Sequence, residues 1–269
     1  MAAEERYERP AIAGSGTIAC GLAASASALS KTMLLARSDA SAWRAEEQAH
    51  SLCAKVDGGD PSNVKVTTQT GDLAECDLAI EAIVEEERPK GELLKELGDA
   101  CPDADLATTT SSLSVAGLGA ASGHGDRIFG LHPFNPVVRM ELIELCVPQG
   151  ARDGISARAR AWCEEMGKTV VEVPDEPGFV VNRLLFPYLF DAVRLMERQD
   201  LEPEAVDACM RLGAGHPLGP LALLDLVGLD VSAAIADKLG IDVPQRVRSM
   251  AAAGAVGQKA GRGFYAYDR

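Results

Sequence analysis

The chain has 269 residues, a length compatible with one large domain or two ordinary ones. Hydrophobic residues make up 47% and charged residues 25%, a balance typical of soluble globular proteins that excludes a disordered tail, a collagen and a disulfide-rich miniprotein. The formal net charge of −14 repels phosphate backbones and anionic lipids, so neither a nucleic acid nor a membrane surface is an expected partner.

The cysteines and histidines give no sign of a metal or a disulfide framework. The seven cysteines are scattered, odd in number and never spaced as C-x-x-C, which favours reduced thiols in a cytoplasmic protein. The four histidines have no ligand spacing with one another or with cysteines, so no metal is expected. The first six residues lack the apolar core of a signal peptide, and the low-charge run 11–30 is rich in Gly, Ala and Ser. We therefore expect no leader and no transmembrane span.

Short apolar runs alternate with helical patterns over the first two thirds of the chain. The expected strands are 10–13, 32–35, 64–67, 77–84, 105–109, 127–131 and 140–147. The expected helices between them are 16–29, 41–55 and 88–100, and residues 117–125 are predicted to be a Gly/Ala/Ser loop. This alternation predicts an α/β fold, a Rossmann-like doubly wound parallel sheet with helices on both faces.

A breaker cluster at residues 174–178, PDEPG, separates this part from a mostly helical remainder. The helices expected in the remainder are 179–199 (interrupted by Pro187), 203–212, 221–239 and 243–253. The predicted organisation is therefore a dinucleotide-binding domain over residues 1–176 and a smaller all-helical domain over residues 177–269.

The first predicted strand and helix are joined by residues 14–19, GSGTIA, a G-x-G-x-x-A pattern. Glycines in this place allow a tight turn and the close approach of a pyrophosphate to the helix N-terminus. The pattern also occurs in plain Gly/Ala-rich turns, but its position at the first strand–helix junction favours a dinucleotide. The candidate cofactor contacts here are Gly14, Gly16, Thr17 and Ile18.

The end of the second predicted strand is where a Rossmann domain carries an acidic residue for the ribose. This chain has Ala36, Arg37 and Ser38 there instead. An arginine beside a serine suits a 2′-phosphate, so NADP is a candidate beside NAD. The alternatives are that Arg37 stacks on the adenine or faces solvent, and that Asp39 reaches the ribose from the following turn.

Polar side chains follow the fifth and sixth predicted strands, at the edge where open α/β sheets bind ligands. Ser111 is a candidate ligand contact, although a turn or helix-capping role would also explain it. His132 is a candidate general base, and Glu144 lies close enough in sequence to be its carboxylate partner. Asn182 stands on an otherwise apolar helix, where an amide is costly unless it has a partner.

These motifs are combined with EAIVE at 81–85, GFVVNRL at 178–184, GAGHPLGPL at 213–221 and GRGFY at 261–265. Taken together, they make the whole chain resemble the 3-hydroxyacyl-CoA dehydrogenase family, including its 3-hydroxybutyryl-CoA members. The resemblance implies an NAD-binding Rossmann domain and a helical domain that forms a homodimer. It also implies hydride transfer between nicotinamide and C3 of a 3-hydroxyacyl thioester.

The same resemblance implies roles for four residues in catalysis. His132 looks like the base that takes the proton of the 3-hydroxyl group, and Glu144 looks like the carboxylate that stabilises the resulting imidazolium. Ser111 and Asn182 look like the groups that position the reacting oxygen. Two further residues, Glu85 and Lys90, fall where the family touches the nicotinamide half of the cofactor.

The region between the second and third strands departs from the family. In the family a longer helical hairpin there carries the basic and hydroxyl residues that grip CoA, whereas this chain has one helix and an acidic turn at 57–61, DGGDP. An acidic turn has the wrong sign for a nucleotide phosphate. The acyl group would then be carried by an acyl carrier protein, as in family branches that make hydroxymalonyl or methoxymalonyl extender units, or still by CoA.

Two alternative functions remain open on the same fold. One is a non-catalytic dinucleotide-binding or structural protein, since a fold does not by itself imply an activity. The other is a dehydrogenase of free hydroxy acids. The family of that kind uses a lysine in the linking helix, and residues 179–199 contain no lysine.

Overall fold

The computed structural model describes residues 6–267. The chain divides into two compact units, Met1–Phe179 and Val180–Arg269. In the described range, no helix is both long and apolar enough to cross a membrane.

The first unit is built on an eight-stranded sheet with the strand order β3-β2-β1-β4-β5-β6-β7-β8. The strands are β1 (Pro10–Ala13), β2 (Thr32–Leu35), β3 (Val64–Thr67), β4 (Leu78–Glu81), β5 (Asp105–Thr108), β6 (Ile128–Pro133), β7 (Leu142–Cys146) and β8 (Thr169–Glu172). Neighbouring strands are parallel except for the antiparallel pair β6–β7. The predicted Rossmann-like sheet is therefore confirmed, with one reversal of direction.

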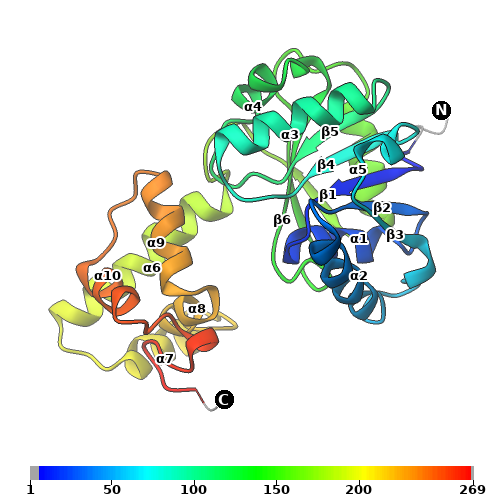
Figure 1. Ribbon diagram of the computed structural model, residues 1–269. Helices are drawn as coiled ribbons and strands as arrows, with labels where there is room; N and C mark the ends of the chain where they lie inside the picture. The colour runs from blue at the N-terminus through cyan, green and yellow to red at the C-terminus, as the bar shows by residue number, and fades with distance from the viewer. Residues whose placement is uncertain (1–5, 268–269) are drawn as a thin grey trace. The chain divides into compact units, whose positions relative to one another are not determined.

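Helices cover both faces of this sheet (Figure 1). They are α1 (Thr17–Ala26), α2 (Asp39–Cys53), α3 (Glu87–Ala100), α4 (Val115–Ser122) and α5 (Ile155–Glu165). Side chains alternate along each strand, so Ile12 and Ile80 join a core with α1, α2 and α5, while Ala11 and Ala79 join a second core with α3 and α4. Burial on both faces explains why β1 and β4 are apolar nearly throughout.

The segment predicted as a Gly/Ala/Ser loop at 117–125 is instead largely helix α4, so that prediction was wrong. Ser114 caps the helix by accepting from the amide of Gly117 at 3.0 Å, and Gly123 ends it in the left-handed conformation with φ 79°. The small residues let α4 pack tightly on α3, because a Cβ built on Gly91 would lie 3.1 Å from the Cβ of Ala121. Packing thus outweighs the low helix propensity of glycine.

Two further predicted elements differ from the structure, and two observed elements were not predicted. The strand predicted at 77–84 is only Leu78–Glu81, and α5 and the edge strand β8 were not predicted. The helix predicted at 221–239 is broken at Gly228, whose φ of 101° cannot continue an α-helix.

The second unit is all-helical. Its helices are α6 (Val181–Arg198), α7 (Pro203–Gly213), α8 (Pro220–Val227), α9 (Leu229–Lys238) and α10 (Gln245–Ala252). The core of this unit is centred on α6, which contributes Phe186, Leu189, Phe190 and Val193. Buried Asp207 accepts from the amides of Leu221 and Ala222 and so caps the N-terminus of α8.

Candidate active site

The loop between β1 and α1 has the backbone geometry of a phosphate-binding turn. Gly14 has φ 152°, and a Cβ built on it would lie 2.2 Å from the carbonyl oxygen of Ala82. Only glycine fits there without displacing the backbone of the neighbouring loop. Its amide donates to the carbonyl of Leu35 at 2.9 Å, which ties the turn to the end of β2.

The N-terminus of α1 is open to a ligand. Gly16 and Thr17 are exposed, Ile18 is half-buried, and no side chain caps the first turn of the helix. A Cβ built on Gly16 meets no protein atom within 4 Å, so the space over the helix N-terminus is clear. Uncapped amides at the positive end of a helix dipole are suited to a pyrophosphate, and these residues fit a dinucleotide.

Of the three candidate cofactor residues at the end of β2, two have contacts within the protein and the third is exposed. Ala36 is buried, and its amide donates to the carbonyl of Thr67. Ser38 caps α2 through a reciprocal pair of contacts with Ser41, so its hydroxyl already has a structural use. Arg37 is exposed at the edge where the adenosine half of a dinucleotide would lie.

His132 and Glu144 face each other across the strand pair β6–β7. They are direct register partners, and His132 Nδ1 lies 2.8 Å from Glu144 Oε2. Both residues are nearly fully buried, at 6% and 1% exposed. A carboxylate only accepts hydrogen bonds, so Nδ1 carries the hydrogen and Nε2 is the ring nitrogen left to exchange a proton.

Two aromatic rings flank the imidazole of His132. The ring of Phe134 lies edge-on at a centroid distance of 4.7 Å, and that of Phe179 is tilted at 5.3 Å. Phe179 has φ 44°, an uncommon conformation for a bulky residue, and its ring remains buried. The imidazole is thus held between aromatic rings on its sides and a carboxylate at Nδ1.

Ser111 lies on the same sheet edge as His132. It follows β5, the parallel neighbour of β6, and the amide of Gly178 donates to its carbonyl at 3.0 Å. The next residue, Phe179, contacts His132, so one short segment touches both candidate residues. The structure therefore brings Ser111, His132 and Glu144 together at the carboxyl ends of β5 and β6.

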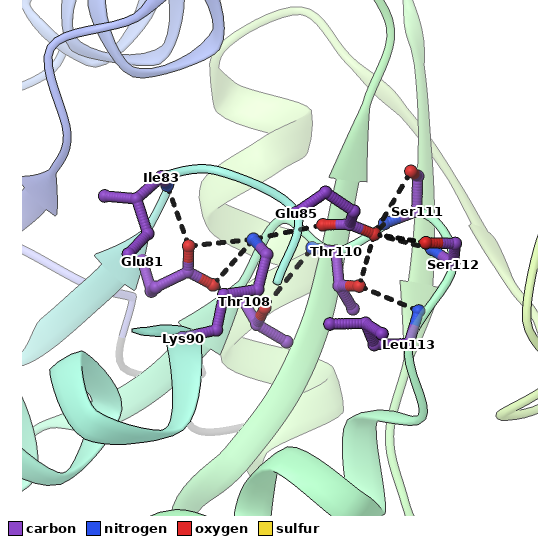
Figure 2. A network of polar contacts seen from close by, with 9 residues as sticks. All are labelled: Glu81, Ile83, Glu85, Lys90, Thr108, Thr110, Ser111, Ser112 and Leu113. Carbon is purple, nitrogen blue, oxygen red and sulfur yellow. Dashed lines mark hydrogen bonds and ion pairs between the residues drawn. The ribbon is translucent and has the colours of Figure 1, made fainter. Parts of the chain in front are cut away.

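The loop that carries Ser111 is held by the carboxylate of Glu85 (Figure 2). Glu85 Oε1 accepts from the amides of Ser111 and Ser112, each at 2.7 Å, and from the hydroxyl of Thr110 at 2.8 Å. It also contacts the Ser112 hydroxyl at 2.9 Å and the Ser111 hydroxyl at 3.3 Å. Burial opposes ionisation of Glu85, but the nearby Lys90 ammonium and these donors outweigh it and bring its pKa to about 2.

Lys90, predicted from the resemblance to touch the cofactor, has a fully buried ammonium group. Its Nζ lies 2.8 and 3.0 Å from the two carboxylate oxygens of Glu81 and 3.3 Å from Glu85 Oε2 (Figure 2). Its side chain is 1% exposed and that of Glu81 is 0% exposed. The structure thus places the Lys90 ammonium between the carboxylates of Glu81 and Glu85.

Asn182 lies in the first turn of α6 and is buried at 8% exposure. It belongs to the second unit, so its proposed contact with the reacting oxygen stays a prediction. Among residues 6–267 there is no group of three His, Cys, Asp or Glu side chains that could hold a metal ion.

Sequence reasoning did not single out three residues that support the site: Glu81, Phe179 and Lys168. The buried Lys168 ammonium donates to the carbonyls of Val137 and Met140, at 2.6 and 2.9 Å, in the loop that follows His132. A signal was available for Glu81, because a charged residue closing the apolar strand LAIE requires a buried partner.

A glycine-rich first turn and a histidine–carboxylate pair at one edge of a doubly wound sheet are typical of nicotinamide-dependent oxidoreductases of the Rossmann type. Comparison with known families agrees with this class. Residues 10–176 match the NAD-binding domain of 3-hydroxyacyl-CoA dehydrogenase, and residues 178–267 match its C-terminal domain. The chain belongs to the 3-hydroxyacyl-CoA dehydrogenase family.

Individual relatives cover most of the chain. A probable 3-hydroxybutyryl-CoA dehydrogenase of Deinococcus radiodurans is 40% identical over 212 residues, which is 76% of each chain. The crystal structure of Mycobacterium tuberculosis FadB2 is similar with a TM-score of 0.92 and 35% identity, covering 98% of this chain and 100% of the other. The (S)-3-hydroxybutyryl-CoA dehydrogenase PaaH1 of Ralstonia eutropha has a TM-score of 0.89 and 32% identity, with the same coverage.

Proposed function

We propose that this protein catalyses the reversible oxidation of a 3-hydroxyacyl thioester to its 3-oxo form, with His132 as the general base. The observation that carries the proposal is the 2.8 Å contact between buried His132 Nδ1 and Glu144 Oε2 at the ligand-binding edge of the sheet. This contact leaves Nε2 as the nitrogen that takes the proton of the 3-hydroxyl group. Family membership supports the choice of a 3-hydroxyacyl substrate.

A nicotinamide cofactor held here would supply the hydride acceptor for C3 in oxidation and the hydride donor in reduction. Gly14, Gly16, Thr17 and Ile18 would hold its pyrophosphate at the N-terminus of α1. NAD is the cofactor favoured by the family, and exposed Arg37 is the residue that would admit the 2′-phosphate of NADP.

The protein's own groups supply the proton chemistry. As the C3–H bond breaks, the hydroxyl proton passes to His132 Nε2, and Glu144 stabilises the positive charge that spreads over the imidazolium. Ser111 and Asn182 would position the reacting oxygen. The Ser111 hydroxyl makes the longest of the five contacts to Glu85 Oε1, so it is the donor most easily redirected to a ligand.

The thioester handle is CoA or an acyl carrier protein. A single helix, α2, leads into a turn where Asp57 and Asp60 are exposed before β3, so this region is acidic as the sequence indicates. That sign disfavours the phosphates of CoA and supports a carrier protein, whereas the names of the relatives support CoA.

The test is a matrix of initial rates that pairs NAD and NADP with one 3-hydroxybutyryl group on CoA and on a carrier protein. The proposed reaction is supported if the wild type turns over at least one cofactor–substrate pair and His132→Gln does not. The faster of the two thioesters identifies the handle, and a preference for NADP over NAD would show that Arg37 holds a phosphate. Tight cofactor binding without turnover of any thioester would instead favour a non-catalytic dinucleotide-binding protein.

We further propose that the helical unit forms a homodimer. Several large apolar side chains of this unit are exposed, among them Leu184, Leu195 and Leu212, the last at 86%. Large apolar side chains that stay exposed on one unit favour a protein interface. Sedimentation velocity should give a dimer for the wild type, and Leu195→Glu should shift it toward the monomer; a wild-type monomer at all concentrations would contradict the proposal.

A further inference from the structure

Two oppositely charged side chains are buried behind the Ser111 loop. Glu81 closes β4 and Lys90 lies in the first turn of α3, and both side chains are at most 1% exposed. The Glu81 carboxylate is fully engaged: Oε1 accepts from the amide of Ile83 at 2.8 Å, and Oε2 accepts from the hydroxyl of Thr108 at 2.7 Å. Buried charges are costly unless they are paired and hydrogen-bonded, and this arrangement meets both conditions.

The Lys90 ammonium is shared between two carboxylates that face it from different segments. It contacts both oxygens of Glu81 and lies 3.3 Å from Glu85 Oε2 (Figure 2). The other oxygen of Glu85 holds the amides and hydroxyls of the Ser111 loop. A continuous chain of polar contacts therefore runs from Glu81 through Lys90 and Glu85 to Ser111.

We propose that the buried Glu81–Lys90 pair is a positioning device that fixes the ionised Glu85 carboxylate against the Ser111 loop. The inference rests on the proposed dehydrogenase function, because it assigns the pair a role in placing the Ser111 hydroxyl. Lys90 acts through Glu85 in this proposal, a role separate from the cofactor contact that the family resemblance implies.

The charges of the network determine how each substitution changes the protonation of Glu85. The groups in this network are Glu81 on β4, Lys90 on α3 and Glu85 on the connecting loop, with uncharged hydroxyls from Thr108, Thr110 and the Ser111 loop. Removal of Lys90 leaves the buried carboxylate of Glu81 and the half-buried carboxylate of Glu85 without their shared cation, and such a pair binds a proton more readily. A protonated Glu85 turns one acceptor oxygen into a donor, so it loses part of its hold on the Ser111 loop.

Removal of both charged partners gives a matched control. Glu81→Gln with Lys90→Met leaves one carboxylate instead of two, so Glu85 ionises at a lower pH than in Lys90→Met alone. Glu81→Gln alone leaves Lys90 to pair with Glu85, so Glu85 stays ionised. Lys90→Arg keeps the positive charge but changes its geometry.

The experiment measures initial rates of acetoacetyl-thioester reduction by NADH from pH 5 to 9 for the wild type and these four variants. Reduction is chosen because His132 then has to be protonated, so the base itself causes no loss on the acid side. We expect Lys90→Met to show a new acid limb with a midpoint above pH 5 and at least a tenfold lower kcat at pH 5 than at pH 8. Wild type, Glu81→Gln and Lys90→Arg should lack this limb, and the double variant should lie between them.

NADH affinity separates the positioning role from direct cofactor contact. At pH 8 the dissociation constant of Lys90→Met, measured by NADH fluorescence, should stay within about threefold of the wild type. The proposal would be overturned if Lys90→Met had the same pH–rate profile as the wild type. It would also be overturned if Lys90→Met lost NADH affinity equally at every pH. If Lys90→Met does not fold, the double variant carries the test, since its single carboxylate has also lost the ammonium.

A second readout does not depend on the proposed reaction. Urea unfolding of the same proteins between pH 3 and 7 should show Lys90→Met losing stability at a higher pH than the wild type. If wild type turns over no thioester but the unfolding curves differ as expected, the proposed function fails while the coupling of Lys90 to Glu85 stands. If the stability of wild type and Lys90→Met depended on pH in the same way, the proposed coupling of Lys90 to Glu85 would be wrong.

Discussion

His132 and Glu144 are direct partners across the antiparallel strands β6 and β7, with Nδ1 2.8 Å from Oε2. Directly opposed residues on such a strand pair lie side by side on one face of the sheet, so the backbone pairing itself sets this contact. The carboxylate then determines which ring nitrogen carries the hydrogen. The catalytic proposal therefore depends on strand register as much as on residue type.

Substitution His132→Gln should abolish the proton transfer while leaving the cofactor site intact. We expect kcat to fall by roughly 10²- to 10⁴-fold, the usual contribution of a positioned base. NADH binding, followed by fluorescence, should stay close to that of the wild type. A variant with undiminished turnover would remove His132 from the role of base.

Substitution Glu144→Gln should preserve the shape of the site but not the tautomer of His132. The amide can donate to Nδ1, which places the imidazole hydrogen on Nε2 and blocks proton acceptance there. We expect kcat to fall by about 10²-fold or more, while Glu144→Asp retains part of the activity because it keeps the charge. Equal activities of the Gln and Asp variants would contradict the tautomer argument.

The two glycines of the first turn should respond differently to the same substitution. Gly14→Ala places a Cβ 2.2 Å from the Ala82 carbonyl, so it should lower the free energy of unfolding by about 1–3 kcal/mol. Gly16→Ala meets no protein atom within 4 Å and should fold normally. Its Cβ would occupy the space that the pyrophosphate needs, so its cofactor dissociation constant should rise at least about tenfold. Calorimetry and NADH titration of both variants test this contrast.

Acid should destabilise the protein through Glu85. Its pKa falls from an ordinary 4.5 to about 2 in the folded protein, so the unfolded chain binds the proton first as the pH falls. Stability that is fully present above pH 4.5 is therefore lost as the pH approaches 2, by an amount of the order of 3 kcal/mol. Urea unfolding at pH 7, 4.5 and 3 should show a smaller decline for Glu85→Gln than for the wild type. Parallel declines would show that Glu85 does not carry this effect.

Lys168 should stabilise the loop that follows His132. Lys168→Met removes the ammonium from the carbonyls of Val137 and Met140 and should cost about 2 kcal/mol, because buried acceptors are left unpaired. Lys65→Met, on the exposed side of β3, is the matched control and should change stability by less than about 0.5 kcal/mol. Similar losses in both variants, measured by thermal unfolding, would contradict a special role for Lys168.

The parts of the fold that were predictable from sequence are those whose pattern is local. Strands β2 and β3 begin and end as predicted, because each is a short stretch rich in apolar and β-branched residues. Helix α4 was missed because Gly, Ala and Ser have no helical periodicity there. What stabilises it is distant in sequence: Asp175 accepts from the amides of Val115 and Ala116, and α3 packs against it.

The candidate site was predictable as a set of residue types but not as a set of contacts. His132 and Glu144 were paired from their sequence separation and from the resemblance, yet nothing in residues 140–147 indicates that the strand runs antiparallel to its neighbour. The resemblance places Lys90 where the family touches the cofactor, which stays a prediction, but it does not show that the ammonium is buried. Its buried position depends on Glu81, whose charge at the end of an apolar strand requires a cation from another segment.

The short hairpin from β6 to β7 has a consequence for how such a site changes over generations. Residues 132–144 form one continuous segment, so recombination that exchanges it transfers the proton acceptor and its carboxylate together. Ser111 and Asn182 lie on other segments and would have to be matched to it separately. A lineage can therefore alter its acyl handle or cofactor preference at other loops and still inherit this pair unbroken.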